Sequence, residues 1–404
     1  MKQRRKRKFF PELLIVLDFG GSLTKVVYTD NEQSPKTLTM EPEVLALSKA
    51  SIESYESSKM GMDSAAPTDK AWVGTADQFY AVGYLAREQF NANAGLSQLK
   101  VDRAVPKAMA AIWAASVDLQ LGNQFEAAVA VLLPPGEFEN AARLRSSIES
   151  SLKEFQTPTG TLNVTLTDWD CKPEGGGVYM MHTIGQLPST FKDKAIAVLM
   201  LGFRNASVLL ATRGAVTKRV TSDLGFTRLL DRVVAKTSGL DRNQLAGAIA
   251  VAGNPPNFDA LMPVLRSTSE ASRKEELMKL RAAIITGRSE YTASLESWFK
   301  EVLPTRVDQV ILCGGTSDYL RPELSAYFKT SSLVWHGQMP QELQDHPLSH
   351  RFFDAFGVYE FLRKLVWERV KIQVREAKEE AKQAEAREKS LASAQSEEVV
   401  RTDA

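Results

Sequence analysis

Short apolar runs recur along the chain and predict buried β-strands. They are rich in Val, Ile, Leu and Ala and are too short for well-formed helices. Turn residues follow several of them, as expected at strand ends. The runs that predict strands most clearly are 13–17, 125–133, 195–201, 207–212, 215–220 and 307–316, the last of which enters a glycine turn.

Helical spacing of apolar residues separates these runs and indicates an α/β fold. Residues 102–120 are rich in alanine and apolar nearly all round, which predicts a largely buried helix. Helices are also expected over 137–155, 267–303 and 352–367, the last packing back on the first part of the chain. Residues 48–69 show little periodicity and are expected to form a surface loop or a mobile insertion.

The last segment, 368–404, differs in character from the rest. It consists almost entirely of Ala, Glu, Lys, Arg, Gln and Ser, with a thin apolar stripe at three-four spacing. Two interpretations stay open. The segment is a solvated helix that frays into a disordered tail, or it is a weak coiled coil or partner-docking helix.

Composition places the chain among globular proteins. Of 404 residues, 44% are hydrophobic and 25% are charged, and the net charge is +1. A net charge this small argues against direct nucleic-acid binding by the core. The apolar runs are too short to span a bilayer. The two cysteines lie far apart without metal-ligand neighbours, which suits a cytoplasmic location.

A basic arm begins the chain. Residues 2–8 hold six bases and no acid, and Phe9 and Phe10 follow. The arm is either a disordered solubilising segment or an electrostatic contact with an anionic surface. Phenylalanines beside the bases favour a membrane surface over nucleic acid.

The segment 13–27 carries the most specific chemistry. A buried strand ends at Asp18, and a glycine turn then leads into a second strand with Ser22, Thr24 and Lys25. Glycines allow backbone N–H groups to surround phosphate oxygens, and the hydroxyls and Lys25 add donors and charge. Asp18 could face Mg²⁺ or its waters. Taken alone, the segment also fits an ordinary glycine hairpin.

Three separated turns, 18–25, 202–205 and 314–316, follow one another in an order that resembles the actin-like ATPase superfamily. Within that superfamily, residues 13–365 are most similar to the ParM-type bacterial actins. The resemblance implies two actin-like (ribonuclease H-like) domains around a nucleotide cleft.

The resemblance also implies a division of the chain. Residues 1–8 form the basic arm, and 9–190 form domain I, which the helix 350–367 completes. Residues 191–349 form domain II, and 368–404 form a charged tail that is helical or disordered.

Site residues carry over from the family by position. The resemblance implies that Asp18 holds Mg²⁺ through water and that Glu174 orients the attacking water, so both are candidate catalytic residues. It assigns nucleotide binding to Gly20, Gly21, Ser22, Thr24, Lys25, Gly202, Arg204, Asn205, Asp223, Gly225, Gly314, Gly315 and Thr316. The second turn departs from the family pattern, because Met200 stands where a carboxylate is expected and a thioether cannot orient water. Arg204 either reaches the phosphates or forms a surface salt bridge.

The function that the resemblance implies is that of a ParM-like filament. It would bind ATP and Mg²⁺, assemble with itself in the cytoplasm, and serve plasmid or DNA segregation or cell shape, through an adaptor protein or at a membrane. Hydrolysis would be slow with Met200 in place. Two alternatives remain: a degenerate scaffold that does not hydrolyse ATP, and a sugar or metabolite kinase of the same superfamily.

Overall fold

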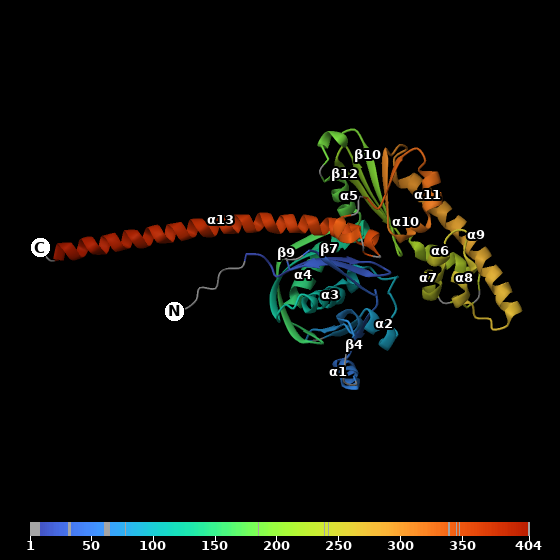
Figure 1. Cartoon of the computed structure of the whole chain (residues 1–404), viewed down its shortest axis with the longest axis horizontal. Helices are drawn as coiled ribbons and strands as arrows, with labels where there is room; N and C mark the ends of the chain where they lie inside the picture. The colour runs from blue at the N-terminus through green and yellow to red at the C-terminus, as the bar shows by residue number, and fades with distance from the viewer. Residues whose placement is uncertain are drawn as a thin grey trace.

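The computed structural model describes residues 9–402, except 31–33, 60–64, 77, 185, 238, 241, 338–339, 345 and 347. The basic arm at 1–8 lies outside the described residues. The chain forms two halves, each built on its own sheet (Figure 1). The first sheet ends at Pro173 and the second begins at Ala195, and the domain boundary at 190 stays a prediction within that interval. Among the described helices, none is long and apolar enough to cross a membrane.

The first sheet has the strand order β3-β2-β1-β7-β9-β8-β5-β6-β4. Strand β1 pairs antiparallel with β2 and parallel with β7, so it lies inside the sheet. The strands are β1 (Leu13–Phe19), β2 (Thr24–Thr29), β3 (Lys36–Met40), β4 (Val44–Leu47), β5 (Trp72–Gly74), β6 (Phe79–Val82), β7 (Gln124–Leu133), β8 (Phe155–Thr157) and β9 (Gly160–Pro173).

Strand β1 is apolar throughout because helices cover both faces of the sheet. Successive side chains of a strand point to opposite faces. Leu13, Ile15 and Leu17 therefore pack in the cluster that holds α3 (Ala104–Asp118). Leu14 and Val16 pack in the cluster that holds the start of α13 (Ser349–Thr402). The first half is thus a three-layer α/β structure.

The second sheet repeats this arrangement in the order β12-β11-β10-β13-β14. One face of β10 packs against α6 and α9, and the other packs against α5. The strands are β10 (Ala195–Leu201), β11 (Ala206–Thr212), β12 (Ala215–Ser222), β13 (Gln309–Cys313) and β14 (Ser332–Trp335). The main helices are α5 (Gly176–Thr183), α6 (Phe226–Ala235), α7 (Arg242–Ala252), α8 (Phe258–Leu261), α9 (Glu270–Val302), α10 (Gly315–Tyr319) and α11 (Arg321–Tyr327).

The segment 48–69 differs from the expected loop. It contains the helix α1 (Lys49–Ser58), whose first turn is capped by the Ser48 side chain, which accepts a hydrogen bond from the Ser51 N–H. One apolar residue, Ile52, is buried beside Trp72 and Phe79. A single buried residue produces no detectable periodicity, so the sequence pattern did not reveal this helix.

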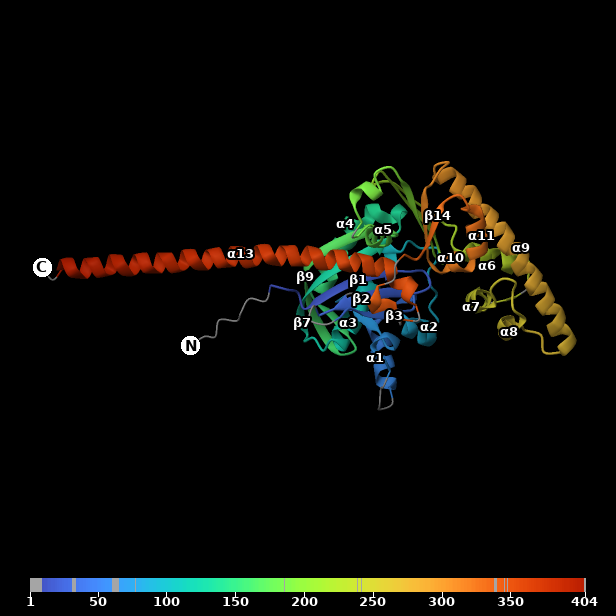
Figure 2. The same cartoon turned by 45° about the horizontal axis from the view of Figure 1, so that its top comes forward.

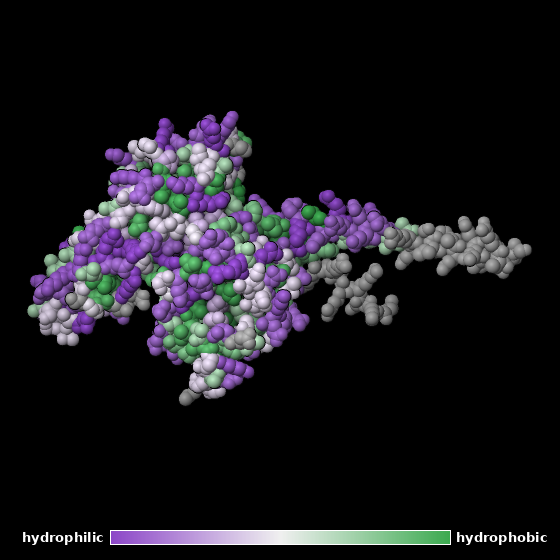
Figure 3. Space-filling model, turned by 180° about the vertical axis from the view of Figure 1, so that it is seen from behind, coloured by the Kyte–Doolittle hydropathy of each residue, from purple (hydrophilic) through white to green (hydrophobic). Residues whose placement is uncertain are grey.

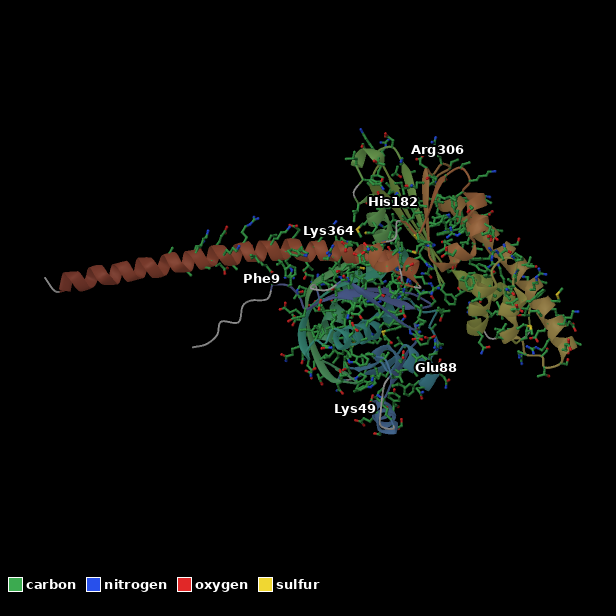
Figure 4. All side chains as sticks on the ribbon, in the orientation of Figure 1. Phe9, Lys49, Glu88, His182, Arg306 and Lys364 are labelled. Carbon is green, nitrogen blue, oxygen red and sulfur yellow. The ribbon has the colours of Figure 1, made fainter. Side chains whose placement is uncertain are left out.

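Helix α13 is longer than the predicted helix over 352–367 and runs without interruption to Thr402. Its first part lies between the two halves, and the rest projects away from the body in both views (Figures 1 and 2). Phe9 lies beneath the helix where it leaves the first half (Figure 4). The described surface of the projecting part is largely hydrophilic (Figure 3).

The crossing of α5 and α13 joins the two halves at very close range. A Cβ added to Gly177 would lie 2.0 Å from the backbone oxygen of Asp354. A Cβ added to Gly357 would lie 2.3 Å from the backbone oxygen of Gly177. The two helices can approach this closely only because neither residue carries a side chain.

A buried carboxylate completes the crossing. Asp354 of α13 accepts hydrogen bonds from the backbone N–H groups of Gly175 (2.8 Å) and Val178 (3.1 Å), at the first turn of α5. Gly175 precedes α5 and has no side chain with which to cap the helix. Asp354 therefore supplies from another element the acceptors that an N-cap residue normally supplies.

Replacement of Gly357 by alanine should destabilise the fold. The added methyl group meets backbone atoms that cannot rotate away, and overpacking of this kind costs about 1–3 kcal/mol. Urea unfolding followed by circular dichroism would measure the loss. Gly122→Ala is the matched control, because a Cβ there meets nothing within 4 Å. Equal stability of the two variants would show that the crossing is not tight.

Stability should also depend on pH through Asp354. Burial raises the pKa of this carboxyl to about 7, whereas an unfolded chain has an aspartate pKa of about 3.9. The folded protein therefore holds the proton more tightly, and the free energy of unfolding falls as pH rises from about 4 to 7, by at most about 1.4 kcal/mol per unit. Asp354→Asn removes this titration. The stability of the wild type relative to this variant should decline between pH 5 and pH 7 in urea unfolding, and a constant difference would contradict the prediction.

Candidate functional site

The first turn joins β1 and β2. Asp18 and Lys25 are directly opposite each other in this antiparallel pair, and their side chains form a close ion pair. Between them, the Gly20 N–H donates to the Asp18 carbonyl over 2.9 Å. A Cβ on Gly20 would lie 2.3 Å from the Leu23 carbonyl oxygen, so the turn requires glycine there. The predicted strand–turn–strand is confirmed.

The second turn joins β10 and β11 and faces the first. The Gly202 N–H donates to the Asn205 carbonyl over 2.9 Å, and Arg204 lies against Gly21 of the first turn. The Gly225 N–H donates to the Arg204 carbonyl over 3.1 Å. A Cβ on Gly225 would collide with the Arg204 backbone, so Gly225 supports the second turn from behind.

The third turn follows β13, which is parallel to β10. Gly314 has a φ of +92°, and a Cβ there would lie 2.3 Å from the Leu201 carbonyl oxygen. The Thr316 hydroxyl donates to the Gly202 carbonyl over 2.9 Å. The second and third turns are therefore held together by direct contacts.

The three turns meet around one cleft with a volume of about 300 Å³. Twelve of the thirteen predicted site residues that belong to the turns or to Glu174 line it: Asp18, Gly20, Gly21, Ser22, Lys25, Glu174, Gly202, Arg204, Asn205, Gly314, Gly315 and Thr316. Thr24, by contrast, is buried beneath the first turn.

Two predicted residues at the start of α6 also lie outside the cleft lining. Gly225 instead lies behind the second turn, against the backbone of Arg204. Asp223 lines a neighbouring hollow and forms a close ion pair with Arg228 at the exposed surface.

Ion pairs dominate one end of the cleft. Lys100, from the loop before α3, forms a close ion pair with Glu174, which also accepts a hydrogen bond from the Ser207 hydroxyl at 3.3 Å. Burial alone would raise the pKa of Asp18, but Lys25 and Lys100 lower it. Burial alone would lower the pKa of Lys100, but Glu174 and Asp18 raise it. Asp18 and Lys100 are therefore both charged at neutral pH.

Arg204 spans the two halves. Its guanidinium lies 3.3 Å from a carboxylate oxygen of Glu137, which is buried and also accepts a hydrogen bond from the Val101 N–H at 3.0 Å. The prediction left open a surface salt bridge or a reach toward the phosphates. Arg204 both forms the ion pair and lines the cleft, so the two interpretations are compatible.

The other end of the cleft is aromatic. Phe203 and Phe226 stack with ring centroids 6.2 Å apart, and Tyr319 meets Phe226 edge-on at 5.3 Å. Small residues of α7, Ala246 and Gly247, line the same end. Such a surface suits a flat ring.

Several residues that line the cleft were not among the site residues predicted from the sequence. Lys100, His350, Arg351 and Asp354 come from loops and helices far from the three turns. Lys100 carries no local pattern that marks it. For His350, Arg351 and Asp354, the only indication in the sequence was that charged or basic residues gather at the start of the predicted amphipathic helix.

The cleft does not fit a bound Mg²⁺ well. Mg²⁺ at a nucleotide is usually held by one or two carboxylates together with phosphates and water, so its fit depends on Asp18 and Glu174. Asp18 and Glu174 are each engaged by a lysine, and Met200 lines the cleft where a further carboxylate was expected. A thioether is a poor ligand for this hard cation.

Comparison with known proteins identifies the fold. No protein-family model and no curated protein sequence matches the chain. Three solved structures are similar: the actin-like protein Alp7A, a ParM filament from Clostridium botulinum and an archaeal actin homologue. Their TM-scores are 0.64, 0.58 and 0.56, with 15%, 14% and 14% sequence identity. The matches cover 90%, 87% and 87% of this chain and 98%, 99% and 99% of the other chains. The predicted fold class is confirmed, and the chain has the actin-like fold of ParM-type proteins.

Proposed function

We propose that the protein binds ATP in the cleft between its two halves and assembles into filaments. The observation that carries the proposal is the meeting of three glycine turns around one cleft that is cationic at one end and aromatic at the other. This combination matches a molecule with a polyphosphate and a flat base.

The phosphates would lie at the first and second turns. The backbone N–H of Gly21 can donate to a phosphate oxygen at close range because no side chain stands in the way, whereas the N–H groups of Gly20 and Gly202 shape their own turns. Lys25, Lys100 and Arg204 supply positive charge around the same point. Three cations and a glycine-lined backbone suit an anion of high charge.

The adenosine would lie at the third turn. Gly314 and Gly315 allow the sugar to approach the backbone, while Phe203, Phe226 and Tyr319 offer apolar contact to the base. Thr316 is engaged with Gly202, so it holds the second and third turns together and would fix the distance between base and phosphate subsites.

Hydrolysis would depend on Glu174. Lys100 and Ser207 hold its carboxylate in place, and a fixed carboxylate can orient an attacking water. Met200 removes a second group that could do so. The loss of one such electrostatic contact commonly slows catalysis by about 10²–10³. Met200 therefore favours slow hydrolysis, and it equally supports the alternative of a scaffold that binds ATP without hydrolysing it.

Filament assembly would follow from the nucleotide state. A ligand that contacts both halves biases the cleft toward closure, and a head-to-tail interface that does not close generates a filament. The solved relatives include a ParM filament and an Alp12 filament. A role in plasmid segregation or cell shape, through an adaptor protein in the cytoplasm or through the basic arm at a membrane, is part of the proposal.

Negative-stain electron microscopy of the purified protein without nucleotide, with ATP and with ADP tests assembly. We expect filaments with ATP, because closure of the cleft favours the assembling conformation. Filaments in all three conditions would support the scaffold. The absence of filaments across a range of salt and protein concentrations would count against the cytoskeletal role and favour a metabolite kinase.

Replacement of Glu174 by glutamine should slow phosphate release by about 10²-fold or more while ATP still binds, because an amide cannot act as the base that orients water. A coupled phosphate-release assay measures the rate, and equilibrium titration with ATP measures binding. Glu149→Gln, at an exposed position of α4 (Ala141–Leu152), is the matched control. If the wild type hydrolyses ATP and Glu174→Gln is equally fast, Glu174 does not have this role.

A further inference from the structure

The ammonium group of Lys100 lies at the centre of the charged end of the cleft. Its side chain is only 10% exposed, and Glu174 pairs with it directly. Asp18 is close enough that each of the two side chains alters the pKa of the other. Lys100 therefore interacts with both carboxylates that the actin-like site would offer to a cation.

Each acidic group around the charged end has a partner from the chain itself. Asp18 pairs with Lys25, Glu174 with Lys100, and Glu137 with Arg204. Asp354 is occupied by the two N–H groups of α5, and burial raises its pKa to about 7. At neutral pH its negative charge is therefore only partly developed.

A divalent cation would have to displace these partners. Binding of the cation to these carboxylates would break the ion pairs of Lys25 and Lys100, whose side chains are only 18% and 10% exposed. The thioether of Met200 is a poor ligand for a hard divalent cation and does not replace the lost carboxylate. Lys25 and Lys100 already neutralise the two carboxylates at this end of the cleft.

Phosphate, by contrast, can join these pairs without breaking them. An ammonium group has three N–H donors, so Lys25 and Lys100 can each donate to a phosphate oxygen while keeping their carboxylate partner. Arg351 of α13 adds a further cation to the cleft lining beside Gly315, and the acidic side chain that acts on its charge is Asp318. The cleft thus holds surplus positive charge for an anion.

We propose that the cleft binds ATP without a divalent cation, and that Lys100 provides the positive charge between Asp18, Glu174 and the phosphates. This inference rests on the proposed nucleotide site. It assigns Lys100 as a residue that determines metal dependence, and it replaces the expectation that Asp18 holds Mg²⁺ through water.

Titration of the full-length protein with a fluorescent ATP analogue, in excess EDTA and in millimolar MgCl₂, tests the proposal. We expect the two dissociation constants to agree within about threefold. A loss of affinity of about tenfold or more in EDTA would overturn the metal-independent site but leave nucleotide binding intact. If the analogue bound in neither condition, the proposed function itself would fail.

The second arm of the experiment uses Lys100→Met, which keeps the length of the side chain and removes its charge. Its affinity in EDTA should fall by about tenfold or more, and MgCl₂ should restore part of it, since the carboxylates are then available to a metal. Lys100→Arg should keep the wild-type behaviour. Unchanged affinity of Lys100→Met in EDTA would overturn the role of Lys100.

Lys107→Met is the matched control. This lysine is also buried, on α3, but it does not line the cleft, and burial lowers its pKa to about 7. Lys107 acts on Asp18 and Lys100 only through its charge, so its replacement should change both dissociation constants less than Lys100→Met does. Thermal unfolding of each variant identifies any that has lost its fold, and a folded Lys107→Met with the same loss as Lys100→Met would show that the effect is not specific to Lys100.

Discussion

The backbone contact between Gly177 and Gly357 constrains the rest of the structure. It brings α5 and α13 together without intervening side chains, and these two helices are the elements that pass between the halves. Glu174 stands just before α5, whereas Arg351 and Asp354 lie on the first turns of α13. The distance between groups on opposite sides of the cleft therefore depends on this crossing. A motion that opens or closes the cleft must turn about a contact that cannot be compressed.

Electrostatics in the cleft follows from the same arrangement. Buried charges are costly unless each is paired. Here the pairs join elements that are distant in the sequence: Lys100 with Glu174, and Arg204 with Glu137. These pairs hold the side chains of Lys100 and Arg204 in place and so position the cations. The charges that order the cleft are thus the same charges that an anionic ligand would meet.

The features that could be predicted from the sequence are those set by local chemistry. The glycine turns and their flanking strands are visible because turn geometry demands particular residues at particular positions. The two-sided burial of β1 is visible as an uninterrupted apolar run. Lys100 and Asp354 could not be found in this way, since only tertiary packing brings them to the cleft. Asp223 has a plausible sequence position but lies at the surface beside Arg228, a placement that depends on how α6 begins. Helix α1 could not be predicted from the sequence, because it buries only Ile52 and one buried position produces no periodic pattern.

The projecting part of α13 has a geometric consequence. The helix leaves the body near Val374 and continues to Thr402, a length of about 40 Å. A rod of this length, rich in charge of both signs, holds neighbouring bodies apart unless their rods interleave. The rod therefore extends the reach of each molecule well beyond its two-sheet body.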